Sequence, residues 1–76
     1  MEKNKLKHEM VYTAAEVALI LRESPASVKE KLESGEIVAY REGTGWKVPK
    51  HLLRVYIENK GITETQERRR LHQEMK

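Results

Sequence analysis

The chain has 76 residues, enough for one small domain with a small core. It contains no Cys, which excludes disulfides and thiolate metal sites, and its net charge of +3 permits nucleic-acid binding without requiring it. The longest apolar run is far shorter than a membrane span, and the first ten residues, MEKNKLKHEM, lack the apolar segment of a secretory signal. We therefore expect a cytoplasmic protein that does not enter a membrane.

The N-terminal part of the chain leads into a first short helix. Residues 1–9 are polar and rich in Lys, so we expect a flexible basic arm. Residues 10–12 form a candidate short strand. Thr13 and Glu16 have the T-x-x-E spacing of a capping box, which predicts a helix over residues 14–22.

A second helix is predicted to follow after a tight turn. Ser24 is a good N-cap and Pro25 a good first helical residue. Val28 and Leu32 form an i, i+4 apolar pair that should face the core, and Gly35 supplies a left-handed stop. Two short helices joined in this way indicate a helix-turn-helix unit.

The next segment has the pattern of a hairpin followed by a third helix. Residues 37–41 and 46–48 are the expected strands, and residues 42–45 are turn formers. The third helix should begin after Pro49 and end at Gly61. Its apolar face is predicted to contain Leu52, Leu53, Tyr56 and Ile57.

Residues 62–76 form a polar tail beyond a domain predicted to span residues 10–61. A capping box at Thr63 and Gln66 allows a fourth helix in this tail. Its basic run is Arg68-Arg69-Arg70; on a helix these side chains point 100° apart, so we expect no single patch and expect Glu64 and Glu67 to pair with two of them. A solvated tail is the first interpretation of this run, and contact with DNA or a partner is the alternative.

The order helix, turn, helix, hairpin, helix resembles a winged helix-turn-helix, an α+β and mainly helical fold. The stretches "YTAAEVALIL" and "SPASVKEKLESGEIVAYREGTGWKVPKHLL" resemble the excisionase-type small DNA-binding domains of the MerR-like superfamily. The resemblance covers residues 12–58. It implies a DNA-binding accessory factor for recombination or a small transcriptional regulator, with the second helix in the major groove and the wing on the DNA backbone or in the minor groove. The chain departs from this family pattern at Arg22 and Glu23, at Pro25 and Ala26, and at the wing tip, where Thr44 and Gly45 replace basic residues.

The candidate DNA-binding residues lie on the second helix and the wing. With Val28 at the centre of the buried stripe, Ala26, Ser27 and Glu30 point outward and Lys29 and Lys31 flank the stripe. We expect Ser27 and Glu30 to face bases, and Lys29 and Lys47 to contact phosphates. The full predicted set is Ser24, Ala26, Ser27, Lys29, Glu30, Lys31, Arg41, Thr44, Gly45 and Lys47, with Arg41 and Lys47 close to each other across the hairpin.

An alternative function remains open at this point. Glu30 and the wing tip without basic residues are also typical of a protein-interaction adaptor that retains the fold and has little affinity for DNA. Double-stranded DNA is the expected partner in the first interpretation, with a recombinase or neighbouring protomers on DNA as further candidates.

We expect no enzyme and no cofactor, because the three His residues are scattered and the chain has no Asp for a catalytic triad. A coiled-coil dimer needs sustained heptads, and the tail offers too few apolar positions, so we expect a monomer in solution.

The predicted core contains Val17, Leu21, Val28, Leu32, Ile37, Val48, Leu53 and Ile57, with Trp46 packed against it.

Overall fold

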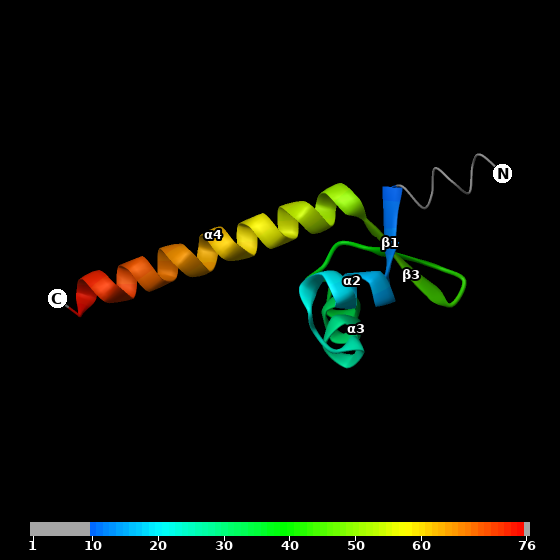
Figure 1. Cartoon of the computed structure of the whole chain (residues 1–76), viewed down its shortest axis with the longest axis horizontal. Coiled ribbons are helices and arrows are strands. Elements are labelled where there is room, and N and C mark those ends of the chain that lie inside the picture. The colour runs from blue at the N-terminus through cyan, green and yellow to red at the C-terminus, as the bar shows by residue number, and fades with distance from the viewer. Residues whose placement is uncertain (1–9, 76) are drawn as a thin grey trace.

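A computed structural model describes residues 10–75 of the chain. Figure 1 shows three helices and a small sheet, with the last helix extending away from the other elements. The expected mainly helical winged helix-turn-helix is confirmed, whereas the predicted basic arm lies outside the described residues. In chain order the elements are β1 (Val11–Thr13), α2 (Ala14–Leu21), α3 (Pro25–Ser34), β2 (Tyr40–Glu42), β3 (Gly45–Pro49) and α4 (Lys50–Glu74).

Local capping interactions fix both ends of α2 and α3. The Thr13 hydroxyl accepts a hydrogen bond from the Glu16 N–H, and the Glu16 carboxylate accepts one from the Thr13 N–H, so the predicted capping box is formed. Arg22 ends α2 in the left-handed conformation at φ 55°, where a non-glycine residue is strained. Gly35 ends α3 at φ 84°, as the sequence predicts.

The candidate strand near residues 10–12 forms as β1, and it joins the two-stranded wing in one sheet. Its order is β1-β3-β2, and both pairs are antiparallel. β1 pairs with β3 through Val11 opposite Pro49 and Thr13 opposite Lys47. The wing hairpin itself closes through a two-residue turn in which Gly43 has a φ of 65°. β1 therefore fixes the base of the wing to the start of α2.

The first wing strand begins at Tyr40, three residues later than predicted. Ile37 is buried, but its N–H donates to the Lys31 carbonyl at 3.2 Å and so completes the end of α3. The predicted strand therefore starts too early, because this apolar residue belongs to the connection between α3 and the sheet.

The core lies between α2, α3, the sheet and the start of α4. Six of the eight predicted core residues are buried, and Leu21 is half-buried against them. Ile57 is 42 % exposed, so its predicted burial is wrong; α4 has left the sheet one turn after the buried Leu53. Trp46 packs against the core, as expected. The buried core residues are Val17, Ala18, Val28, Leu32, Ile37, Val48 and Leu53.

The last helix, α4, continues through Gly61, where the sequence predicts its end. A glycine that stops a helix takes a positive φ, and among the described glycines only Gly35 and Gly43 do so. Gly61 instead stays within the helix, at an intrinsic cost of about 1 kcal/mol relative to Ala. The predicted third helix and the tail are thus one continuous helix of 25 residues.

Ion pairs along α4 also differ from the predicted ones. Arg70 pairs with both Glu67 and Glu74, on neighbouring turns of the same helix. Glu64 lies near Lys60 at 3.9 Å, whereas Arg68 donates to the Thr65 hydroxyl. The expected pairing of Glu64 with one of the three arginines is therefore wrong.

Candidate nucleic-acid interface

The second helix of the helix-turn-helix unit, α3, presents one polar side to solvent. The Ser24 hydroxyl accepts a hydrogen bond from the Ser27 N–H at 3.2 Å, which caps the helix and sets its direction. Val28 and Leu32 are 1 % and 3 % exposed, so the opposite side of α3 faces the core. Ala26, Lys29 and Glu30 are exposed, as the helical geometry predicts.

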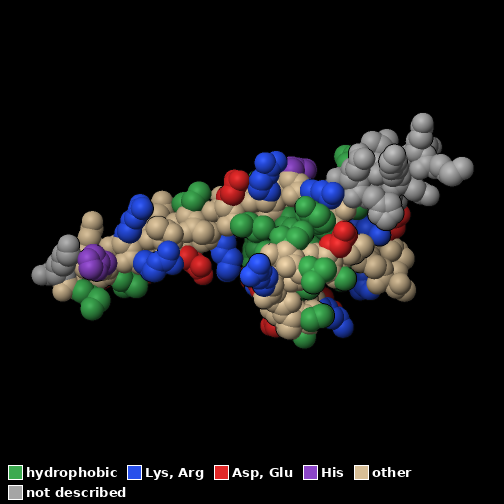
Figure 2. All heavy atoms as spheres, viewed as in Figure 1, with side chains coloured by type: hydrophobic (Ala, Val, Ile, Leu, Met, Phe, Trp, Pro, Cys, Tyr) green, Lys and Arg blue, Asp and Glu red, His purple; other side chains and the backbone are tan. Residues whose placement is uncertain are grey.

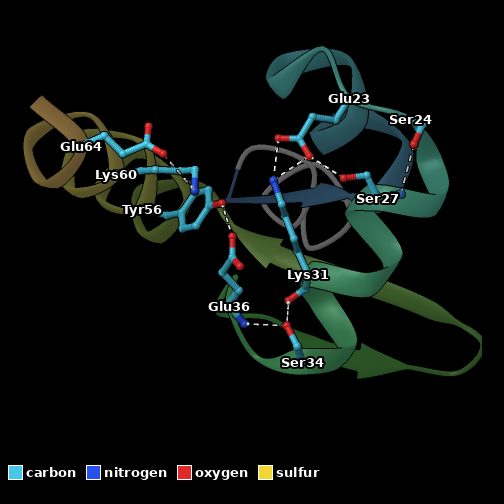
Figure 3. Close-up of polar contacts among 9 residues, drawn as sticks. All are labelled: Glu23, Ser24, Ser27, Lys31, Ser34, Glu36, Tyr56, Lys60 and Glu64. Atoms are coloured by element: carbon cyan, nitrogen blue, oxygen red, sulfur yellow. Dashed lines mark hydrogen bonds and ion pairs between the residues drawn. The ribbon is translucent and has the colours of Figure 1, made fainter. Parts of the chain in front are cut away.

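A carboxylate from the turn holds two of the predicted contact residues. Glu23 accepts a hydrogen bond from the Ser27 hydroxyl at 2.7 Å and from the Lys31 ammonium at 2.6 and 2.8 Å (Figure 3). The bond from Lys31, followed by that from Ser27, lowers the pKa of Glu23. The same contact with Glu23 raises the pKa of Lys31. Lys31 is therefore neutralised by an internal partner and lies partly buried.

A groove between α3 and the wing brings together residues from four elements, α2, α3, β2 and β3; we call it the wing groove. It has a volume of about 400 Å³. Lys29 from α3 meets Arg41 and Thr44 from the wing in this groove, and these three belong to the predicted DNA-binding set. The guanidinium of Arg41 lies 5.2 Å from the centre of the Trp46 ring, a cation–π contact. The lining residues are Ala14, Pro25, Lys29, Glu33, Arg41, Thr44 and Trp46.

Lys47 does not join Arg41 as the sequence predicts. Arg41 is directly opposite Trp46 in the hairpin, whereas Lys47 is opposite Tyr40 on one side and Thr13 on the other. Successive side chains on a strand point to opposite faces, so Arg41 and Lys47 leave the sheet on different faces. Val48 shares the Trp46 face and is fully buried, which places Lys47 on the face away from the core.

The remaining predicted residue of the wing, Gly45, starts β3 opposite Glu42 and is exposed. Lys29 has no hydrogen-bond or ion-pair partner among residues 10–75, which leaves its ammonium available to a ligand. The wing groove thus offers two cations, a hydroxyl and an aromatic ring next to the outward face of α3, together with one carboxylate, that of Glu33. Such a set is suited to phosphates and sugars.

Sequence reasoning missed the role of Glu23. Its four-residue spacing to Ser27 was a usable signal, because residues four apart on a helix are neighbours. Its contact with Lys31, eight residues away, depends on how the turn folds back over α3. The sequence pattern alone does not show how this turn lies over α3.

The described part of the chain has neither a metal-binding cluster nor a membrane-spanning helix. Residues 10–75 contain no group of three or more His, Cys, Asp or Glu side chains that could hold a metal ion. None of the helices over the same residues is both long enough and apolar enough to cross a membrane.

Comparison with known proteins gives one match. A family model described as a helix-turn-helix domain matches residues 11–61, which is most of the chain. Comparison with curated proteins and with solved structures gives no significant match.

Proposed function

Because the chain belongs to the helix-turn-helix domain family, whose match supports DNA binding, we propose that it binds double-stranded DNA in a sequence-specific way. In this proposal it acts as an excisionase-like accessory factor or a small transcriptional regulator, and it is a monomer in solution. The observation that carries the proposal is the wing groove, which joins Lys29 of α3 to Arg41 and Thr44 of the wing. A helix in the major groove and an adjacent wing on the backbone need cations at this junction.

We assign different tasks to the outward face of α3 and to the wing groove. Ala26, Ser27 and Glu30 face base edges: Ala can contact a thymine methyl, Ser can bond several base edges, and Glu can accept from cytosine N4. Lys29 and Arg41 contact phosphates, with Thr44 and the backbone of Gly45 at the wing tip. Ser24 and Lys31 support this surface: Ser24 caps α3 from the turn, and Lys31 on α3 anchors Glu23 of the turn.

Lys47 tests whether the wing groove is the DNA-binding face. Lys29→Gln and Lys47→Gln remove the same charge, but the two side chains lie on different sides of the wing. Loss of one phosphate contact lowers the slope of log K against log salt concentration by roughly one unit. We expect this change for Lys29→Gln and little change for Lys47→Gln, measured by salt titration on a selected duplex and a scrambled duplex.

Two results would contradict these assignments, one for the wing groove and one for Glu30. If Lys47→Gln alone reduces the salt slope, the DNA lies on the outer face of the sheet. In that case our assignment of the wing groove is wrong.

Glu30→Ala should relax the preference at a single base pair by about 1–3 kcal/mol. A uniform effect of Glu30→Ala on both duplexes would exclude direct base reading by this residue.

A protein-interaction adaptor is the second candidate function. A groove of about 430 Å³ lies between α4 and the segment before the wing, and it exposes apolar side chains. Val38 and Val55 on its walls are 57 % and 45 % exposed. Exposed apolar surface of this kind can serve protein contacts. Absence of DNA binding by the parent protein at low salt would favour the adaptor.

A further inference from the structure

The second half of α4 projects from the domain and carries cations that the helix-turn-helix unit does not use. We call residues 62–74 distal α4. The molecule is 59 Å long and 24 Å across, and Figure 1 shows that this helix forms its long axis. Figure 2 shows Lys and Arg side chains along the whole length of α4. These cations could contact a polyanion outside the wing groove.

Within the Arg68-Arg69-Arg70 run, the carboxylates gather on one side of the helix. Arg70 donates to Glu74 at 2.8 Å and to Glu67 through two nitrogens, so its charge is balanced. Arg68 donates to the uncharged Thr65 hydroxyl at 3.0 Å, and Arg69 has no ion-pair partner among residues 10–75. Two neighbouring arginines therefore remain without a carboxylate.

These two arginines share a shallow hollow, which we call the distal hollow. It has a volume of about 490 Å³, and every side chain that lines it can donate a hydrogen bond. No carboxylate lines it, whereas Glu33 is part of the wing groove. The lining residues are Thr65, Arg68, Arg69, His72 and Gln73. This chemistry fits a phosphate, which accepts hydrogen bonds from guanidinium groups.

The side of α4 that carries the distal hollow also carries Arg54, close to the domain. With steps of 100° per residue, Arg68 lies about 40° from Arg54, Arg69 about 60° and His72 in line with it. Arg54 and His72 are about 27 Å apart along the helix axis. Glu58 is the one carboxylate on this face between them. We call this side of α4, with Arg54 near the domain and Arg68, Arg69 and His72 near the end of the helix, the basic strip; between Arg54 and Arg68 it carries no Lys or Arg.

The basic strip and the outward face of α3 lie on different elements of the molecule. Leu53 is the buried residue of α4 and points about 100° away from Arg54, and the half-buried Tyr56 points a further 60° away. The basic strip is therefore turned well away from the core, whereas the outward face of α3 lies on another side of that core. The distal hollow also lies on the part of α4 that extends away from α3 (Figure 1).

We propose that the basic strip of α4, centred on the distal hollow, binds the phosphate backbone of a second DNA segment, apart from the one that α3 contacts. This inference rests on the proposed DNA-binding function. The distal hollow is lined by polar donors only, so it offers a partner protein no aromatic anchor. A phosphate backbone needs only cations and hydrogen-bond donors, and the interaction is independent of base sequence.

The chain offers a matched pair of variants for the test. Arg69→Gln and Arg70→Gln each remove one positive charge at adjacent positions, and Gln keeps a good helix propensity. Of these two arginines, Arg69 lines the distal hollow and Arg70 does not. The experiment immobilises one duplex, adds the full-length protein, and measures capture of a second, labelled duplex as salt is raised. Far-UV circular dichroism of both variants checks that the helix is intact.

We expect the parent and Arg70→Gln to capture the second duplex to a similar extent. Arg69→Gln should capture several-fold less and should lower the salt slope of the capture step by roughly one unit, with binding to the immobilised duplex unchanged. Equal capture by the two variants would overturn the proposal. So would an effect of Arg69→Gln on the first duplex alone, because the strip would then contact DNA that flanks the α3 site.

Lys29→Gln separates this proposal from the proposed function. If the parent holds the immobilised duplex through Lys29 but captures no second duplex, only the second site is wrong. If the parent does not bind the immobilised duplex at all, the DNA-binding function itself is wrong.

Discussion

Charged and polar side chains pair differently in two regions of the molecule. Around the helix-turn-helix unit the partners are far apart in the sequence, whereas in distal α4 they lie on the same helix. In the unit, the Lys31 ammonium reaches Glu23 eight residues away, and just after the unit Glu36 accepts a hydrogen bond from the Tyr56 hydroxyl of α4, twenty residues away (Figure 3). In distal α4, Arg70 bonds only to residues three and four positions away on the same helix. Contacts between elements thus organise the unit, while helical periodicity alone organises distal α4.

This difference has a consequence for stability. Side chains that link separate elements lose their contacts when the domain unfolds, so their removal should lower the free energy of unfolding. Side chains on an exposed single helix contribute only a few tenths of a kcal/mol per pair. Variants that make the same chemical change in the two regions should therefore differ.

The largest expected difference is between two leucines. Leu32 is 3 % exposed in the core and Leu71 is 45 % exposed on distal α4. Leu32→Ala should cost roughly 2–5 kcal/mol, because it removes buried methyl groups and leaves a cavity in a small domain. Leu71→Ala should change stability by less than about 0.5 kcal/mol. Thermal melts of both variants give the comparison, and similar midpoints would mean that α3 does not pack through Leu32.

A smaller and pH-dependent effect is expected at Glu23. The hydrogen bonds from Lys31 and Ser27 lower the pKa of Glu23 in the folded protein. The ionised Glu23 therefore stabilises the folded state at pH values above the pKa of the unfolded chain. This contribution is lost as the pH falls through the folded pKa. Glu23→Gln should cost about 1–2 kcal/mol at neutral pH. In acid the parent and the variant should converge. Urea denaturation at several acidic and neutral pH values measures this.

Glu74→Gln is the control for that measurement. It removes the same charge from an exposed carboxylate whose partner, Arg70, lies on the same helix. We expect no change in the urea midpoint at any of these pH values. If Glu74→Gln had the same effect as Glu23→Gln, the pH dependence would reflect net charge and not the Glu23 contacts.

The smallest expected effect is a gain in stability at the end of α2. Arg22 has a φ of 55°, which costs a non-glycine residue roughly 1–2 kcal/mol. Gly removes this strain but adds freedom to the unfolded chain, so Arg22→Gly should stabilise the domain by about 0.5–1 kcal/mol. Arg22→Ala keeps the Cβ atom and should give no such gain in urea denaturation. A loss of stability in Arg22→Gly would mean that the Arg22 side chain makes a stabilising contact.

The amino-acid sequence by itself determined the features that depend on neighbours along the chain. The capping box at Thr13, the N-cap at Ser24, the stop at Gly35 and the buried pair Val28 and Leu32 were all predicted correctly. Each of these depends on φ, ψ preferences or on helical spacing within one turn or two. The order of the elements, and with it the helix-turn-helix unit, follows from such local signals.

The tertiary structure alone decided which surfaces these elements form. The strand β1 adds to the wing, and the register of β3 places Lys47 on the outer face, away from Arg41. The turn after α2 brings Glu23 onto Lys31, so this lysine is not a free cation. Register and the contacts between elements depend on residues far apart in the chain, which periodicity does not report.

Gly61 and Ile57 show the same limit along α4. A glycine followed by polar residues resembles a helix end, and an apolar residue one turn after Leu53 resembles a core position. In the structure the helix continues through Gly61, and Ile57 lies beyond the sheet that would have covered it. The sequence supplied the helical spacing of the arginines that follow. The fold decided that this part of the helix projects and leaves Arg69 accessible, because no other element packs against it (Figure 1).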